Sequence, residues 1–342
     1  MPDDRSESQS TSSSDTPWTT RKLLSWITSR LEKSSIDSPR RSAEMLVSGA
    51  IGCDRLRLYM EPERISSDEE RTVLRDLVTR ATRNEPIQYL VGEGWLHGRA
   101  YEVDSSTLIP RPSTETLVEH ASKVLASVDG AKFLEIGIGA GCVTVSILDA
   151  LDRPGRAESR RKAAAIADAL PFQKANQDQA EEPPEAHAAK PAPAEVVAVE
   201  IVPEAAELAK RNLARHGVLD RIDLRVGSLY EPLDEHHLNT FDLIVSNPPY
   251  ISDAEWAQCD PNVKDYEPET ALRGGVDGLD VIRPLVAHAP QYLKSGGWLA
   301  IEIQHDQGSA VTGLCTSAGL SSIVVQKDHE GHDRIILAQW CG

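Results

Sequence analysis

The chain has 342 residues, of which 40% are hydrophobic and 26% are charged, as in globular proteins that bury a substantial core. Its net charge of −17 argues against a protein that grips nucleic acid through the phosphates. No apolar run reaches the roughly 18 residues that a membrane-spanning helix needs. We therefore expect no membrane span, and the length allows two domains.

Neither the N-terminus nor the cysteines indicate export. Residues 1–16 are rich in Ser and Thr, lack the apolar stretch of a signal peptide and are too acidic for a typical transit peptide. We expect them to form a disordered tail. The five cysteines are scattered and form no CxxC pair, which favours a reducing compartment and argues against a zinc site. We therefore predict a cytoplasmic protein without a bound metal.

The first folded part is predicted to be a small helical bundle. Apolar residues recur at helical spacing over 18–33, and three further helices are expected to begin at Ser38-Pro39, at Asp54 and at Ser66 or Ser67. Periodicity alone leaves a scaffold, a dimerisation unit and a substrate clamp as open interpretations.

A connecting segment follows the bundle. Residues 95–103 alternate as in a β-hairpin, and Arg111 then lies between Pro110 and Pro112, which fix an extended backbone. An arginine held in this way often orders a loop or faces an anion, and the alternative is a surface arginine in a linker. Ser113 or Thr114 is expected to cap the next helix.

A glycine-rich turn then indicates a nucleotide-like cofactor. A short buried strand over 132–136 leads into glycines at alternate positions and a helix over 142–151. Dinucleotide-binding proteins use a similar turn, but here the spacing is E-x-G-x-G-x-G. That pattern favours S-adenosylmethionine, whose cationic amino acid part needs backbone and carboxylate partners. The candidate cofactor residues are Glu135, Gly137, Ile138, Gly139, Ala140 and Gly141.

The next two strands extend this site. The strand 196–200 ends in Glu200, which in a doubly wound sheet would reach the ribose hydroxyls, although a solvated acid is the plainer interpretation. The strand 221–226 ends before Gly227 and Ser228, where the adenine would lie.

An unusual segment separates the first two of these strands. Within 152–194, the part over 156–170 has a composition that a helix tolerates, and 173–194 is rich in Pro, Ala, Glu and Gln. A connection from a helix to the next parallel strand runs at the edge opposite the ligand. We expect a spectator insertion, with binding of another partner as the alternative.

The candidate reaction centre is Asn247-Pro248-Pro249-Tyr250, which follows a buried strand over 241–246. The asparagine oxygen and a rigid proline carbonyl offer two acceptors, and an aromatic ring lies close by. This arrangement suits a planar NH2 group, although a strand followed by a proline turn explains the same four residues.

The C-terminal part completes a sheet. We predict an irregular segment over 265–279 followed by a helix through His288, a strand over 298–303 after Gly296-Gly297, and a hairpin of 322–327 with 334–339. The hairpin turn 328–333 carries two histidines, but a polar loop is favoured over a metal site.

Taken together, these stretches resemble the HemK/PrmC family of protein-(glutamine-N5) methyltransferases over about 18–151 and 195–340. The matching motifs are Glu-Pro-Ile-Gln-Tyr-Leu at 85–90, Leu-Ile-Pro-Arg-Pro at 108–112, the 135–141 loop and Asn-Pro-Pro-Tyr at 247–250. The Glu267-Pro268 pair and the Gly331/Arg334 hairpin follow in the order of the family.

The resemblance implies an α/β class I S-adenosylmethionine-dependent methyltransferase with a doubly wound, seven-stranded, mostly parallel sheet and an antiparallel C-terminal hairpin, preceded by a small helical domain. The expected boundaries are a tail over 1–16, a helical substrate-recognition domain over 17–93, a hairpin linker over 94–112 and a methyltransferase domain over 113–342.

The resemblance also implies an activity: methylation of the glutamine amide in the Gly-Gly-Gln motif of peptide chain release factors, by direct in-line transfer. Asn247, Pro248 and Tyr250 are then the expected catalytic residues, and Pro249 and Arg111 join them in binding the substrate. Asn247 is also expected to touch the cofactor. No nucleic acid, membrane or metal is expected as a partner.

Two departures from the family pattern stand out. The 152–194 insertion is atypical, and Gly227-Ser228-Leu229 lacks the acid and the aromatic residue often found at the adenine edge. Ser228 and Leu229 are nevertheless the expected adenine contacts.

Three alternatives stay open at this point: an adenine-N6 DNA methyltransferase, which shares the tetrapeptide, a glutamine methyltransferase of a ribosomal protein, and a catalytically silent binding module.

Overall fold

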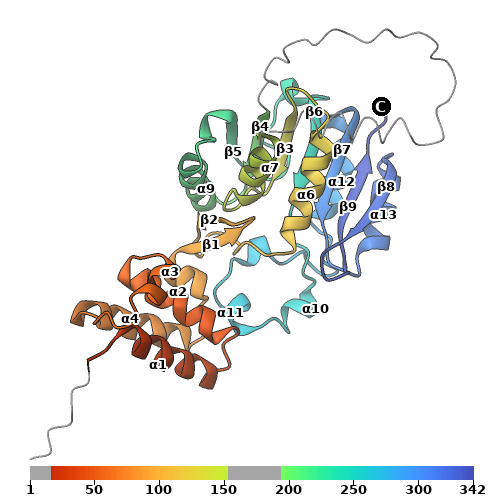
Figure 1. Cartoon of the computed structure of the whole chain (residues 1–342). Coiled ribbons are helices and arrows are strands. Elements are labelled where there is room, and N and C mark those ends of the chain that lie inside the picture. The colour runs from red at the N-terminus through yellow and green to blue at the C-terminus, as the bar shows by residue number, and fades with distance from the viewer. Residues whose placement is uncertain (1–16, 153–193) are drawn as a thin grey trace, which may run out of the picture. The chain divides into compact units, whose positions relative to one another are not determined.

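A computed structural model describes residues 17–152 and 194–342 (Figure 1). The predicted tail over 1–16 and nearly all of the predicted 152–194 insertion lie outside the described residues. The chain divides into two compact units between Val91 and Gly92. In the part that is described, no helix combines the length and the apolar character needed to cross a membrane.

The first unit consists of short helices around one apolar core. They are α1 (Thr20–Lys33), α2 (Pro39–Ile51), α3 (Arg55–Met60), α4 (Asp68–Ala81) and α5 (Ile87–Val91). Asp54 caps α3 as expected, and Ser67 caps α4 in a capping box with Glu70. Ser38 differs from the prediction, because its backbone is left-handed and its side chain makes no capping hydrogen bond. Pro39 at the first helical position starts α2 in its place.

The second unit is built on a seven-stranded sheet with the order β5-β4-β3-β6-β7-β9-β8, together with the separate hairpin β1-β2. The strands are β1 (Glu93–Leu96), β2 (Arg99–Glu102), β3 (Lys132–Ile136), β4 (Glu195–Glu200), β5 (Ile222–Val226), β6 (Phe241–Ser246), β7 (Leu293–Glu302), β8 (Ser321–Lys327) and β9 (Asp333–Gln339). The pairs among β3 to β7 are parallel, and β9 is antiparallel to both neighbours. The expected α/β fold class is confirmed.

Helices cover both faces of this sheet (Figure 1). They are α6 (Thr114–Leu125), α7 (Cys142–Asp152), α9 (Pro203–Arg215), α12 (Ile282–Tyr292) and α13 (Gly308–Ser317), whereas the short helices α10 (Asp253–Trp256) and α11 (Pro261–Lys264) lie in the segment between β6 and α12. Successive strand residues point to opposite faces. Phe133 and Leu243 therefore pack with α6 and α7, whereas Leu134 and Ile244 pack with α12 and α13.

The strand order reverses between β3 and β6, which lie side by side although β4 and β5 separate them in sequence. Ser246 pairs with Ile136 at the carboxyl ends of these two strands, and its hydroxyl donates to the Ile136 carbonyl at 2.7 Å. Open α/β sheets bind ligands at such a switch point. The glycine-rich turn and the Asn-Pro-Pro-Tyr loop therefore leave the sheet next to each other.

Strand β7 and helix α13 are among the elements that differ from the prediction. Strand β7 begins at Leu293, before the glycine pair, because a register shift opposite Phe241 and Leu243 accommodates the extra residues. A side chain on Gly297 would lie only 2.9 Å from the Phe241 carbonyl oxygen, so the shift depends on glycine there. Helix α13 was not predicted, since its Gly, Ser and Thr residues have low helix propensity.

Candidate active site

A cavity of about 490 Å³ lies at the carboxyl ends of β3, β4, β5 and β6. Its lining brings together most of the residues predicted from the sequence: Arg111, Glu135, Gly137, Ile138, Gly139, Ala140, Glu200, Ser228, Leu229, Asn247, Pro248 and Pro249. Within the described chain, Gly141 and Tyr250 are the predicted residues that do not line it.

The glycine turn leaves open space on the cavity side. Gly137 and Gly139 have φ values of 76° and 52°, and a side chain at either position would meet no atom within 4 Å. The Gly137 and Ile138 amides donate to the Val199 carbonyl, at 2.8 and 3.1 Å, which fixes the turn against β4. A ligand can therefore approach the backbone closely, as the amino acid part of S-adenosylmethionine requires.

Glu135 is a buried carboxyl at the floor of this turn. Its Oε2 accepts from the Thr144 amide at 3.1 Å and from the Thr144 hydroxyl, so it satisfies a donor in the first turn of α7. Burial raises the pKa of Glu135 to about 8. A cation bound in the cavity would favour the ionised form, and Glu135 thus fits the charge of the cofactor as well as supporting the helix.

Glu200 supports the glycine turn directly. Its Oε2 accepts from the Gly139 amide at 2.9 Å, and its Oε1 accepts from the Val202 amide at 3.0 Å. A carboxylate oxygen has a second lone pair, so Glu200 keeps the capacity to accept from hydroxyl groups in the cavity.

Asn212 of α9 joins the hairpin to the same turn. This side chain is fully buried, its Oδ1 accepts from the Glu102 amide at 2.8 Å, and its Nδ2 donates to the Glu102 and Ala140 carbonyls, both at 2.9 Å. The carboxamide therefore connects β2 with the cavity lining.

Arg111 orders a loop, which was one of its two predicted roles. Its guanidinium contacts Glu267 Oε1, and Oε2 of the same buried carboxylate accepts from the Ile109 amide at 3.2 Å. The charge of Arg111 is thus balanced by Glu267, although Arg111 still lines the cavity.

Asn247 is held by one hydrogen bond, from Nδ2 to Thr114 Oγ1 at 3.2 Å. No group in the described chain donates to its Oδ1, which is left as an acceptor. Pro248 and Pro249 line the cavity beside it with their φ angles fixed by the ring. The amide side chain and the loop backbone can therefore present acceptors to one ligand group.

Tyr250 anchors the loop from behind. Its hydroxyl donates to Glu302 Oε1 at 3.2 Å, and its carbonyl accepts from Gln307 Nε2 at 3.0 Å. Gln307 also donates to the Gly278 carbonyl at 3.3 Å, so the segment after the loop is tied to Tyr250. Burial raises the pKa of the Tyr250 hydroxyl well above its usual range, which keeps it a donor. Stacking of its ring on a substrate amide stays a prediction.

Three residues of this arrangement were missed or misassigned from the sequence. Gln307 carried no signal, and Thr114 was considered only as a helix cap. Glu302 is an acid in the otherwise apolar run 299–303, and this break in the pattern is the feature of the sequence that could have identified it. Ser113 occupies the N-cap position of α6 but makes no capping bond. Its hydroxyl donates instead to Glu302 Oε1 at 3.4 Å.

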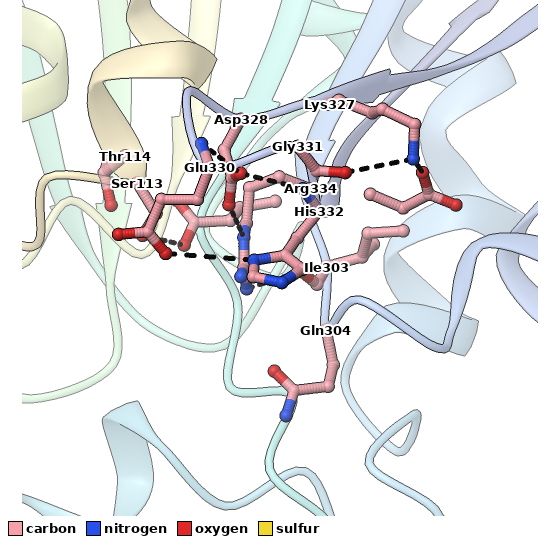
Figure 2. A network of polar contacts seen from close by, with 12 residues as sticks. Ser113, Thr114, Ile303, Gln304, Lys327, Asp328, Glu330, Gly331, His332 and Arg334 are labelled. Carbon is pink, nitrogen blue, oxygen red and sulfur yellow. Dashed lines mark hydrogen bonds and ion pairs between the residues drawn. The ribbon is translucent and has the colours of Figure 1, made fainter.

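The turn of the last hairpin is a polar network, as predicted (Figure 2). Asp328 accepts from the Glu330 and His332 amides, both at 3.0 Å, and from Arg334 Nε at 3.1 Å. Arg334 also donates to the Ile303 carbonyl at 3.3 Å, which fixes the turn to the end of β7. No group of three metal-binding side chains occurs among the described residues, and the expected lack of a metal stays a prediction.

Comparison with known families gives two matches. Residues 22–92 match the family model of the PrmC N-terminal domain, and residues 172–305 match that of N-6 DNA Methylase.

Three curated relatives, each named release factor glutamine methyltransferase, match over nearly their whole length. The protein from Geobacter sulfurreducens is 37% identical over 319 residues, covering 93% of this chain and 96% of the relative. The protein from Rhodopirellula baltica is 33% identical, covering 96% and 98%, and that from Chlorobaculum tepidum is 31% identical, covering 93% and 96%.

Proposed function

Because this chain belongs to the release factor glutamine methyltransferase family, we propose that it methylates the side-chain amide of the glutamine in the Gly-Gly-Gln motif of peptide chain release factors. The chain is a methyltransferase, and its cofactor is S-adenosylmethionine. The observation that supports the proposal most is a single cavity lined by both the glycine turn and Asn247-Pro248.

The cofactor, when bound, supplies an electrophilic methyl group. We assign its amino acid part to the open glycine turn, where the positive charge of the cofactor would favour the ionised form of Glu135 over the neutral form that burial favours. Glu200 accepts from the ribose hydroxyls, and Ser228 and Leu229 contact the adenine. Asn247, which follows β6, is the remaining residue that we assign to the cofactor.

The chain's own residues prepare the target nitrogen. An amide nitrogen is a poor nucleophile because its lone pair is delocalised. Asn247 Oδ1 and the Pro248 carbonyl accept its two protons, orient it for in-line transfer and stabilise the positive charge that develops on it. The product nitrogen becomes acidic enough to lose a proton afterwards, so no strong base is needed beforehand. Tyr250 packs on the amide plane. Pro249 and Arg111 line the part of the cavity that receives the substrate.

The protein substrate needs a binding surface of its own. We assign this role to the helical unit, within which residues 22–92 match the PrmC N-terminal domain. The proposed partner is thus a release factor, without a direct nucleic acid, membrane or metal partner. The reaction is placed in the cytoplasm, where release factors act on ribosomes.

Radiolabelled methyl transfer tests this function. The chain should label an intact release factor and leave a variant with the target glutamine replaced by alanine unlabelled. Because residues 172–305 match N-6 DNA Methylase, adenine-bearing DNA is the necessary second substrate, and ribosomal proteins are the third. Label on DNA or on a ribosomal protein, with none on the release factor, would reject the proposal.

A further inference from the structure

The two prolines of the Asn-Pro-Pro-Tyr loop limit how the loop can be anchored. Pro248 and Pro249 have no N–H group, so their backbone can accept hydrogen bonds but cannot donate any. The loop is instead held at its two ends, by the side chain of Asn247 and by the Tyr250 carbonyl, which accepts from Gln307 Nε2 at 3.0 Å. The acceptors that face the cavity therefore depend on groups outside the loop for their position.

Gln307 is a buried carboxamide whose side-chain hydrogen bonds go to backbone groups. It lies just before α13, with 7% of its surface exposed. Its Nε2 donates to the carbonyls of Tyr250 at 3.0 Å and Gly278 at 3.3 Å, and its Oε1 accepts from the Gln304 amide at 3.0 Å. A backbone amide can only donate and a backbone carbonyl can only accept. These partners therefore fix which way the carboxamide faces, and both of its N–H protons hold carbonyl groups.

The segment that begins at Leu272 runs beside the loop. Its Leu272 carbonyl accepts from the Ile251 amide at 2.9 Å, and its Gly274 amide donates to the Ile251 carbonyl at 2.8 Å. A side chain on Gly274 would lie only 2.8 Å from the Pro249 carbonyl oxygen. The two segments thus contact each other along their backbones, and Gln307 bonds to a carbonyl of each.

Gln307 takes its own position from the sheet. Just beyond the end of β7, the Ile303 amide donates to the Arg334 carbonyl at 2.8 Å, and Arg334 Nη1 donates to the Ile303 carbonyl at 3.3 Å (Figure 2). The next residue, Gln304, provides the amide that orients Gln307. The carboxamide is therefore fixed by the ends of β7 and β9 and not by the loop that it holds.

We propose that Gln307 is a positioning residue for methyl transfer: by holding the Tyr250 carbonyl, it fixes the path of the loop so that Asn247 Oδ1 and the Pro248 carbonyl meet the substrate amide. The proposal rests on the proposed function and adds to it a residue that does not line the cavity. A role in starting α13 does not explain the carboxamide. Gln307 occupies the N-cap position of that helix, but its side chain makes no capping hydrogen bond.

Gln307→Met tests the carboxamide, since methionine has a similar length and no hydrogen-bond donor. The Tyr250 and Gly278 carbonyls would lose their shared donor, and the loop would no longer be held in one position. Turnover should fall about 10- to 100-fold, as is typical when reacting groups are slightly misplaced. The KM for the release factor and the Kd for the cofactor should stay within about threefold of wild type, because the residues that line the cavity are unchanged.

Gln307→Glu is the second variant. It keeps the shape of the side chain and the acceptor for the Gln304 amide, but it replaces the NH2 group with an oxygen that faces two carbonyls. Its turnover should fall at least as far as that of Q307M. The matched control is Gln339→Met, because Gln339 Nε2 also donates to a glycine carbonyl, that of Gly296 at 3.1 Å, near the opposite end of β7. Q339M should keep the turnover of wild type.

Coupling to Asn247 separates positioning from a general loss of stability. Asn247→Ala removes one of the acceptors that Gln307 is proposed to place. Q307M should therefore cost a smaller factor in turnover when it is combined with N247A than it costs in wild type. Equal factors in the two backgrounds would show that Gln307 does not act through Asn247, and they reject the positioning role.

Single-turnover transfer, cofactor calorimetry and thermal unfolding are measured for all variants. If wild type transfers methyl to the release factor and Q307M stays within about threefold of it, the positioning role is rejected while the proposed function stands. An equal loss in Q339M, or a fall in cofactor affinity as large as the fall in turnover, rejects it as well. A wild type that does not methylate the release factor rejects the proposed function itself. Should Q307M unfold, Q307E is judged by the same criteria.

Discussion

Asn247 is the residue on which the proposed chemistry depends most. Asn247→Ala removes an acceptor needed mainly as charge develops on the target nitrogen, so turnover should fall by about 10²–10³. Cofactor affinity should fall far less, because the glycine turn and Glu200 provide most of that site. Single-turnover transfer and calorimetry separate the two effects. Transfer within a few-fold of wild type would make the loop merely structural.

Asn247→Asp is the informative companion to that variant. It keeps an acceptor oxygen at the same position but lacks the NH2 group that donates to Thr114. Partial activity is therefore expected, above that of the alanine variant.

Glu200 combines two tasks that substitution can separate. Glu200→Ala removes the ribose acceptor and should weaken cofactor binding by roughly 1.5–3 kcal/mol, as for a charged hydrogen-bond partner. It also leaves the Gly139 and Val202 amides without their acceptor. Glu200→Gln keeps one acceptor oxygen and should lose less. Calorimetry that finds equal affinity in wild type and both variants would remove Glu200 from the site.

At the scale of elements, the segment after the loop is part of the site. Gly278 has a φ of 75°, and a side chain there would collide with the Tyr250 carbonyl oxygen and with Gln307. Gly278→Ala should therefore displace the loop and reduce methyl transfer strongly. Gly217→Ala is the matched control, since Gly217 has a φ of 70° and no atom within 4 Å of an added side chain. Both variants carry backbone strain of about 1 kcal/mol, so only the first should lose activity beyond its loss of stability. Equal activities relative to thermal stability would contradict this account.

Strands β3 and β6 were predictable because each is a short apolar run closely followed by glycine or proline. The runs ending at Ile136 and Ser246 coincide with β3 and β6 at both ends. Helix α5 was not predicted, since five residues are too few to show a period.

Contacts between distant elements were not predictable. Ser113 and Glu302, which share a hydrogen bond, are separated by most of the second unit in sequence, and the packing of α6 against β6 and β7 brings them together. The sequence identified the acceptors that face the cavity, whereas the groups that orient them depend on tertiary packing.

At the scale of the whole molecule, the two residues that flank the insertion, Asp152 and Ala194, are held close together. Arg221 donates to Asp152 at 2.5 Å and to the Ala194 carbonyl at 3.2 Å, so one side chain holds both flanks together. These flanks lie at the end of α7 and the start of β4, opposite the cavity. Deleting 173–193 should leave methyl transfer nearly unchanged, since both described flanks of the insertion lie away from the cavity. Lost activity in a folded deletion protein would contradict this placement.

The helical unit offers a second test at this scale. It has its own apolar core, and so does the second unit. Removing residues 18–92 should abolish binding of the release factor while cofactor binding persists, measured by calorimetry for both ligands. Full activity of the shortened protein on an intact release factor would assign the bundle another role.

The buried carboxamide of Asn212 couples the β1-β2 hairpin to the glycine turn. It bonds the backbone of Glu102 in β2 and that of Ala140 in the glycine turn, so neither segment can loosen without releasing the other. Thermodynamic linkage is reciprocal, and ordering either segment lowers the free energy needed to order the other by the same amount. Gly92 joins α5 of the first unit to β1 in sequence. A protein that orders this hairpin on binding would therefore raise the affinity for the cofactor, and the cofactor would raise the affinity for that protein.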